Sequence, residues 1–79
     1  MRTIDYIDLA KIEMRGKYPF DERVLHYANL MKQGEVFPPI KVKNIGKGKF
    51  RIKDGRHRYL ANKLVGNKKI KCMFFKEIR

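Results

Sequence analysis

A short polar run in the second half of the sequence combines three potential phosphate ligands with a glycine. A helix is predicted to begin directly after that glycine, and the first turn of a helix leaves backbone N–H groups unpaired, which attracts anions. Basic side chains there oppose the helix dipole, so stability alone would favour acids. The sequence therefore predicts a phosphate-binding turn made of Gly55, Arg56, His57 and Arg58 and preceded by Asp54.

The residues of this turn have distinct expected roles. Gly55 lets the chain turn sharply and a ligand approach the backbone, and Arg58 offers a planar guanidinium fork to phosphate. The alternative for Arg58 is an ordinary ion pair with Asp54 or Glu77. His57 is either a ligand or a structural residue, and Asp54 is expected to hold Arg58 or His57 in place. If the protein is an enzyme, Asp54 and His57 are the candidates for acid–base catalysis.

A second candidate site is the polar face of a predicted β-hairpin over residues 40–53. Apolar residues alternate with basic ones on both sides of a Gly-Lys-Gly turn, which predicts two paired strands with one apolar and one basic face. The basic face either follows a nucleic-acid backbone or is ordinary solvated sheet surface. Its residues are Lys41, Lys43, Arg51 and Lys53.

The remaining elements are predicted from periodicity and capping residues. Residues 3–9 form a strand, and Asp8 is placed to cap a brief helical turn after it. A helix begins after Asp21, its N-cap, and ends at Gly34. A second helix follows the phosphate turn, and residues 70–75 form a strand inside the sheet because both of its faces are apolar. This order predicts a small α+β domain with a mixed sheet and two main helices.

Length and composition limit the classes of protein that fit. The 79 residues are expected to form one domain, 1–79, with enough apolar material, 43%, for a thin core. The one cysteine, Cys72, rules out an internal disulfide and a cysteine-based metal site, and its apolar neighbours predict a packing role. Without an apolar run near the length of a membrane span, the protein is predicted to be cytoplasmic.

Positive charge is concentrated in one half of the chain. The net charge is +12, and residues 40–79 carry fourteen basic against two acidic side chains, whereas residues 1–39 carry six of each. Such asymmetry favours a polyanionic partner, either nucleic acid or a nucleotide. The alternative is a lysine-rich surface that only keeps the protein in solution.

The progression from residue 50 onward resembles the ParB/sulfiredoxin superfamily. That superfamily has a strand, a Gly-x-(His or Arg)-Arg turn, a helix, a glycine and a strand in this order, as this chain does over residues 50–70. The segment Phe37-Pro38-Pro39-Ile40 is also similar to the superfamily's proline-led strand. The resemblance covers residues 3–75 and implies a ParB/sulfiredoxin-like fold.

Two branches of the superfamily match the turn incompletely. In ParB proteins a Gly-Glu-Arg-Arg turn grips the phosphates of CTP, and Gly55, His57 and Arg58 match it, but Arg56 stands at the acidic position. That replacement argues against metal-assisted use of CTP. In sulfiredoxins a cysteine precedes the His-Arg pair, and Arg56 stands there too, so sulfiredoxin activity is excluded.

A third branch, a free-serine kinase, carries Asp-Gly-His-His-Arg at this turn. Asp54, Gly55, His57 and Arg58 match it directly. The resemblance implies that an upstream carboxylate could serve as a base. The carboxylates available in the corresponding region are Glu13, Asp21 and Glu22.

The leading hypothesis is a ParB-like, phosphate-recognising module that binds nucleic acid or a nucleotide without turnover, as in a phage, plasmid or other mobile element. The ParB helix-turn-helix DNA reader has no counterpart here, so site-specific DNA reading is not expected. No cofactor or metal is required, while ATP, ADP and CTP are candidate ligands and Mg²⁺ is a less favoured one. One alternative is a small nucleotide-dependent phosphotransferase or nuclease. Another is a basic interaction or inhibitor protein that docks on an acidic protein partner.

Overall fold

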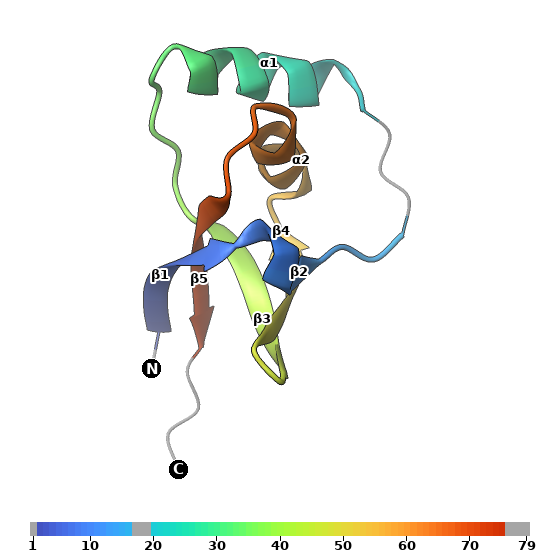
Figure 1. Cartoon of the computed structure of the whole chain (residues 1–79), viewed down its shortest axis with the longest axis vertical. Coiled ribbons are helices and arrows are strands. Elements are labelled where there is room, and N and C mark those ends of the chain that lie inside the picture. Colours follow the sequence, from blue (N-terminus) through green and yellow to red (C-terminus); the bar gives the residue numbers. More distant parts are fainter. Residues whose placement is uncertain (1, 17–19, 76–79) are drawn as a thin grey trace.

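Two helices and a five-stranded mixed sheet make up the described part of the chain, residues 2–16 and 20–75, in a computed structural model (Figure 1). A 3-10 turn, Leu9–Lys11, follows the first strand. The helices are α1 (Glu22–Lys32) and α2 (Arg56–Leu64). The strands are β1 (Arg2–Asp8), β2 (Ile12–Glu13), β3 (Ile40–Gly46), β4 (Lys49–Asp54) and β5 (Lys69–Phe75).

The strands lie in the order β1-β5-β3-β4-β2. The pairs β1/β5 and β3/β4 are antiparallel, whereas β3/β5 and β2/β4 are parallel. The predicted α+β class and mixed sheet are confirmed, as is the interior position of β5. The predicted hairpin is also present as β3 and β4.

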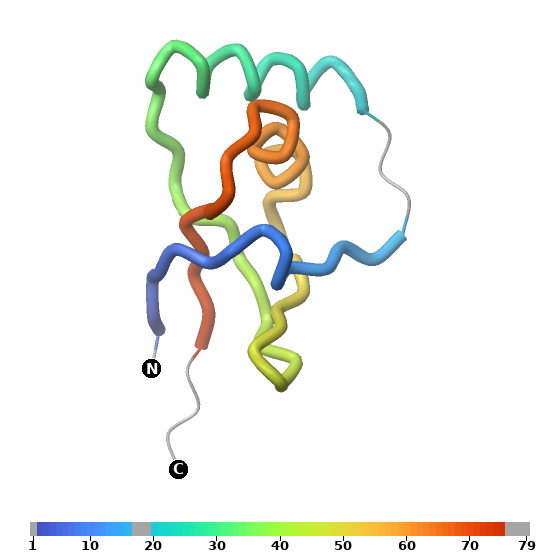
Figure 2. Tube along the Cα trace, in the orientation of Figure 1, coloured from blue at the N-terminus to red at the C-terminus, as the bar shows by residue number. Residues whose placement is uncertain are grey.

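The helices lie at one side of the molecule, α1 packed on α2. In Figure 1, α1 runs across the top of the molecule, and α2 lies between α1 and the strands. Figure 2 shows the turn between β3 and β4 on the side of the sheet away from α1. The core joins both helices to the sheet, and its most completely buried large side chains are Ile40, Val24 and Cys72.

Alternating side chains give the sheet an inner and an outer face. In β3, Ile40 and Val42 are buried, while Lys41 and Lys43, which alternate with them, are exposed. The same alternation in β5 buries Ile70 and Cys72. The outer face therefore carries the basic residues that the sequence assigned to it.

The capping predictions have different outcomes at the two candidate aspartates. Asp21 has extended backbone and its carboxylate accepts hydrogen bonds from the N–H groups of Arg23 and Val24, at 3.0 and 3.3 Å, so the predicted N-cap is confirmed. Asp8 precedes the 3-10 turn, but its side chain makes no capping hydrogen bond, so that prediction is wrong. A turn of three residues is short enough to form without a side-chain cap.

Candidate functional site

Gly55 makes the sharp turn between β4 and α2. Its φ of 110° and ψ of 28° lie in the left-handed region, which side-chain-bearing residues rarely adopt. A Cβ atom here would lie 2.5 Å from Cγ2 and 2.7 Å from Cβ of Ile40, the first residue of β3. Both the backbone conformation and the contact with β3 therefore require glycine.

The first turn of α2 has no side-chain cap. Its N-cap residue, Gly55, has no side chain that could accept a hydrogen bond, its first turn contains no acidic residue, and its first intrahelical bond runs from the Tyr59 N–H to the Gly55 carbonyl at 2.9 Å. Arg56 and His57, both half-buried, occupy the first two helical positions. Positive side chains and backbone N–H groups thus gather at the positive end of the helix dipole.

The guanidinium of Arg58 folds back over this helix start. A Cβ atom on Gly55 would lie 3.3 Å from one of its terminal nitrogens, Nη2. Its other terminal nitrogen, Nη1, donates a hydrogen bond of 2.7 Å to the carbonyl of Pro38. That bond uses one of the five N–H donors of the group. The proline-led segment therefore positions the side chain that the sequence singled out as a phosphate fork.

His57 joins the beginnings of the two helices. Its Nε2 lies 3.2 Å from Oδ2 of Asp21, and both side chains are partly exposed. Desolvation alone would raise the pKa of Asp21. Hydrogen bonds from the Val24 N–H, the His57 ring and the Arg23 N–H outweigh it and hold that pKa below its ordinary value.

Asp54 does not hold either side chain that it was expected to position. Among the described residues, His57 bonds to Asp21 and Arg58 bonds to Pro38 instead. Asp54 ends β4 opposite Lys41, whereas His57 and Arg58 lie in α2 and reach Asp21 and Pro38. The alternative ion pair with Glu77 falls outside the described residues.

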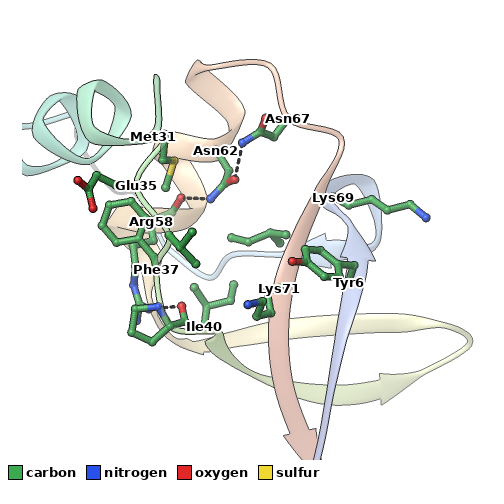
Figure 3. A pocket seen from close by; sticks show the side chains of 13 residues that line it. Tyr6, Met31, Glu35, Phe37, Ile40, Arg58, Asn62, Asn67, Lys69 and Lys71 are labelled. Carbon is green, nitrogen blue, oxygen red and sulfur yellow. Dashed lines mark hydrogen bonds between the residues drawn. The ribbon is translucent and has the colours of Figure 1, made fainter. Parts of the chain in front are cut away.

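Arg58 lies between two hollows in the surface. The first, of about 360 Å³, is bounded by Arg58 and Asn62 of α2, Lys69 and Lys71 of β5, and Glu35 (Figure 3). The second, of about 490 Å³, has Asp54, Arg58 and Lys41 at its polar side. Both hollows also include the apolar side chains of Phe37 and Pro38. A guanidinium placed between charged and apolar walls suits a ligand with an anionic and an apolar part.

Sequence reasoning did not single out Asn62, a buried polar residue of α2. Its Nδ2 donates to the Arg58 carbonyl at 2.8 Å, and its Oδ1 accepts from Asn67 at 2.8 Å (Figure 3). The first bond lies within α2, and the second fixes α2 against the loop that leads into β5. A polar residue on the apolar side of an amphipathic helix is the signal that could have identified it.

The predicted basic face of the hairpin is only partly available to a ligand. Lys41, Lys43 and Lys53 are exposed. Arg51 is half-buried, and its guanidinium nitrogens Nε and Nη2 both lie 2.7 Å from Oε1 of Glu13. This ion pair spans the parallel pairing of β2 with β4, so Glu13 supports the sheet at this position.

Cys72 is a buried free thiol in the core. Burial, and to a lesser extent Asp5, raises the pKa of the Cys72 thiol to about 12, so this buried side chain packs in the core as a protonated thiol. Among residues 2–16 and 20–75, no three His, Cys, Asp or Glu side chains come together as a metal site. Neither α1 nor α2 has the length and apolar character needed to cross a membrane.

Comparison with protein families gives one match over almost the whole chain. The family model of the ParB N-terminal domain matches residues 1–78. No curated protein matches the sequence.

Solved structures share the fold. Sulfiredoxin from Arabidopsis thaliana is 26% identical, with a TM-score of 0.76 over 95% of this chain and 86% of that one. The chromosome-partitioning protein ParB from Caulobacter crescentus, truncated at its C-terminus and complexed with CTP-gamma-S, is 18% identical, with a TM-score of 0.76 over 96% of this chain. A free serine kinase in complex with ADP is 19% identical, with a TM-score of 0.77 over 92% of this chain. This chain spans 46% of that ParB and 31% of that kinase.

Proposed function

The chain belongs to the ParB N-terminal domain family, and we propose that it binds the phosphate groups of a nucleotide at the turn formed by residues 55–58. The observation that carries this proposal is the fold-back of Arg58 over Gly55, where α2 begins without a side-chain cap. Backbone N–H groups and a guanidinium then face the same space, which is the donor set that phosphate prefers.

The surroundings of Arg58 support a nucleotide over a bare phosphate ion. The second hollow places Asp54 and Lys41 near Arg58 and continues along Tyr27 and Phe37, which are half-buried aromatic residues. Tyr27 and Phe37 meet edge to face, with ring centroids 5.4 Å apart. A phosphate group on Arg58 would leave the base within reach of these apolar walls. The solved ParB and kinase structures, which hold CTP-gamma-S and ADP, agree with this class of ligand.

Isothermal titration calorimetry with ADP, ATP and CTP tests the proposal. Arg58→Ala is expected to weaken binding by about tenfold or more, because a charge-assisted hydrogen-bond pair is lost. Arg58→Lys keeps the charge without the fork and is expected to bind with intermediate affinity. Lys32→Ala, at the far end of α1, is the matched control and should leave affinity unchanged.

The Arg58 variants can be interpreted only if they fold. The Pro38 carbonyl that Arg58 bonds is exposed, so water can replace the lost donor, and circular dichroism should show native structure. Nucleotide affinity in Arg58→Ala equal to that of the unchanged protein would refute the phosphate turn.

A second candidate function, a small phosphotransferase, is favoured by one specific observation. The 3.2 Å contact of His57 with Asp21 places a carboxylate behind an imidazole beside the turn, which is a general-base arrangement. Asp54 is the other acid at the turn. This candidate predicts metal-dependent consumption of ATP, ADP, CTP or DNA that Asp54→Ala or His57→Gln abolishes while nucleotide binding survives. Nucleotide binding without any such turnover would support the binding function proposed first and exclude the phosphotransferase.

A further inference from the structure

The outer face of β1 and β5 carries large apolar side chains, of which Ile4, Tyr6 and Phe75 are more than half exposed. The register pairs Arg2 with Phe75, Ile4 with Met73 and Tyr6 with Lys71, so these six side chains share one face. We call this surface the open face. It lies on the side of the sheet opposite the buried Ile70 and Cys72.

Aromatic side chains on the open face are unusually accessible. Tyr6 is 60% and Phe75 is 65% exposed, and Ile4 between them in the register is 57% exposed. Single exposed apolar residues need no explanation, but several on one face of a sheet mark a binding surface. The two aromatic residues lie at opposite ends of the protein's sequence, so only the fold brings them together.

A cation accompanies each of these aromatic rings. The Arg2 guanidinium lies 5.8 Å from the centroid of Phe75, and Nζ of Lys71 lies 5.8 Å from the centroid of Tyr6. Next in the sheet, Lys41 lies beside Met73, and Lys43 shares the outer face with it. The acids at the margins each face a cation: Asp8 lies opposite Lys69, Asp54 lies opposite Lys41, and Glu13 bonds Arg51.

Exposed rings interleaved with cations suit a chain that alternates flat bases with phosphates. Bases stack on aromatic side chains whatever their sequence, while Lys and Arg track the backbone. In a duplex the base faces are already stacked on one another and are not available to a protein ring. Tyr6 pairs with Lys71, four residues before Phe75, so the two aromatic positions are about 13 Å apart along the sheet. That spacing exceeds the 3.4 Å step of stacked bases and fits an extended strand.

We propose that the open face binds single-stranded nucleic acid, with bases stacked on Tyr6 and Phe75 and phosphates held by Arg2, Lys41 and Lys71. This site goes beyond the phosphate turn: it uses none of residues 55–58, although Lys41 and Lys71 also line the hollows beside Arg58. The hollow that contains Met73, Lys41 and Arg58 connects the open face with the turn. A bound strand can therefore continue from one surface to the other.

Fluorescence anisotropy with labelled oligonucleotides tests this proposal on the full chain. The probes are oligothymidylate, oligouridylate and a DNA duplex, each about 20 units long, which exceeds the footprint of a small single-strand-binding domain. Both single strands are expected to bind about tenfold or more tightly than the duplex. A comparison of the affinities for oligothymidylate and oligouridylate shows whether DNA or RNA is preferred.

Aromatic variants test base stacking itself. Tyr6→Leu and Phe75→Leu keep an apolar side chain at an exposed position and should each weaken single-strand binding about fivefold or more. Phe20→Leu is the matched control, since Phe20 is also 60% exposed but lies beside α1, and it should change affinity less than twofold. Equal affinities for single strand and duplex, or unchanged affinity in both aromatic variants, would overturn the proposal.

Salt dependence tests the part assigned to the cations. Lys41→Gln should lower the slope of log affinity against log salt by about one, because one phosphate contact is lost, while Lys32→Gln should leave the slope unchanged. An unaltered slope in Lys41→Gln would contradict this assignment.

The two proposals fail separately. If Arg58→Ala abolishes nucleotide binding but oligothymidylate still binds, the open face stands on its own. If no single strand binds at low salt while nucleotides do, the open face is not a nucleic-acid site and an acidic protein becomes its candidate partner.

Discussion

The two helices of this protein begin in opposite ways. At α1, Asp21 has extended backbone, its carboxylate accepts from two backbone N–H groups, and an acidic residue, Glu22, opens the helix. At α2, Gly55 has left-handed backbone, no side chain caps the first turn, and the first three residues are basic or histidine. The beginning of α1 is stabilised by its own residues, whereas that of α2 has the composition of an anion site.

The same contact that joins the two helix starts also shows how they differ. One carboxylate oxygen of Asp21 caps α1, and the other meets His57 of α2. The acid that α2 lacks in its own first turn is thus supplied to its His57 from the neighbouring helix. Arg58 bonds the Pro38 carbonyl and no acid of the described residues, and it is over Gly55 and Arg58 that we place the phosphate.

The largest expected effect comes from a side chain at the start of α2. Gly55→Ala places a Cβ atom against Ile40 and forces alanine to adopt a φ of 110°, so we expect a loss of about 3 kcal/mol in the free energy of unfolding. Gly34→Ala is the matched control, because Gly34 has a φ of 87° but nothing within 4 Å of its Cβ position. It should cost about 1 kcal/mol. Urea unfolding measures both, and equal losses would show that contact with β3 does not matter.

A smaller effect is expected from removing the cap of α1. Asp21→Ala should lower the free energy of unfolding by about 1 kcal/mol, since two backbone N–H groups lose their acceptor. Asp8→Ala, at the 3-10 turn where no side-chain cap forms, should change it by less than about 0.5 kcal/mol. A greater loss in Asp8→Ala than in Asp21→Ala would contradict the assigned capping roles.

The smallest expected effect is on the pH dependence of stability. The pKa of Asp21 is lowered in the folded protein, so its charged form stabilises the fold above the ordinary pKa of about 3.8. That contribution is lost as pH falls through the lowered value. Melting temperatures of the unchanged protein and of Asp21→Asn can be compared from pH 6 to pH 2.5. The difference between the two proteins should be largest at pH 6. A difference that grows toward low pH would have the wrong sign.

Elements with a strong periodic pattern could be predicted from the sequence. Asp21 and Gly34 marked the ends of α1, and the alternation of Ile40 and Val42 with lysines marked β3. The strand β2 was missed because two residues, Ile12–Glu13, are too short to show a period, and their partner in β4 is far along the chain.

Contacts between distant segments could not be predicted in the same way. The turn between β4 and α2 was predicted from local composition, but the partners of His57 and Arg58 were not. Asp21 and Pro38 reach these side chains only through the packing of α1 and of the segment that precedes β3. For the same reason the sequence did not indicate that Tyr6 and Phe75 share a face. Local turns and helix starts were predictable, while contacts set by the packing and the sheet register required the structure.

The most direct test of the phosphate turn is an ADP titration of the ¹⁵N-labelled protein followed by NMR. The amide signals of Gly55, His57 and Arg58 should shift most and saturate together, while those of Arg23 and Val24, already bonded to Asp21, should move little. Arg58→Ala should remove the shifts at the turn. Saturating ADP that leaves the amides of residues 55–58 unmoved would contradict the proposal that this turn binds phosphate.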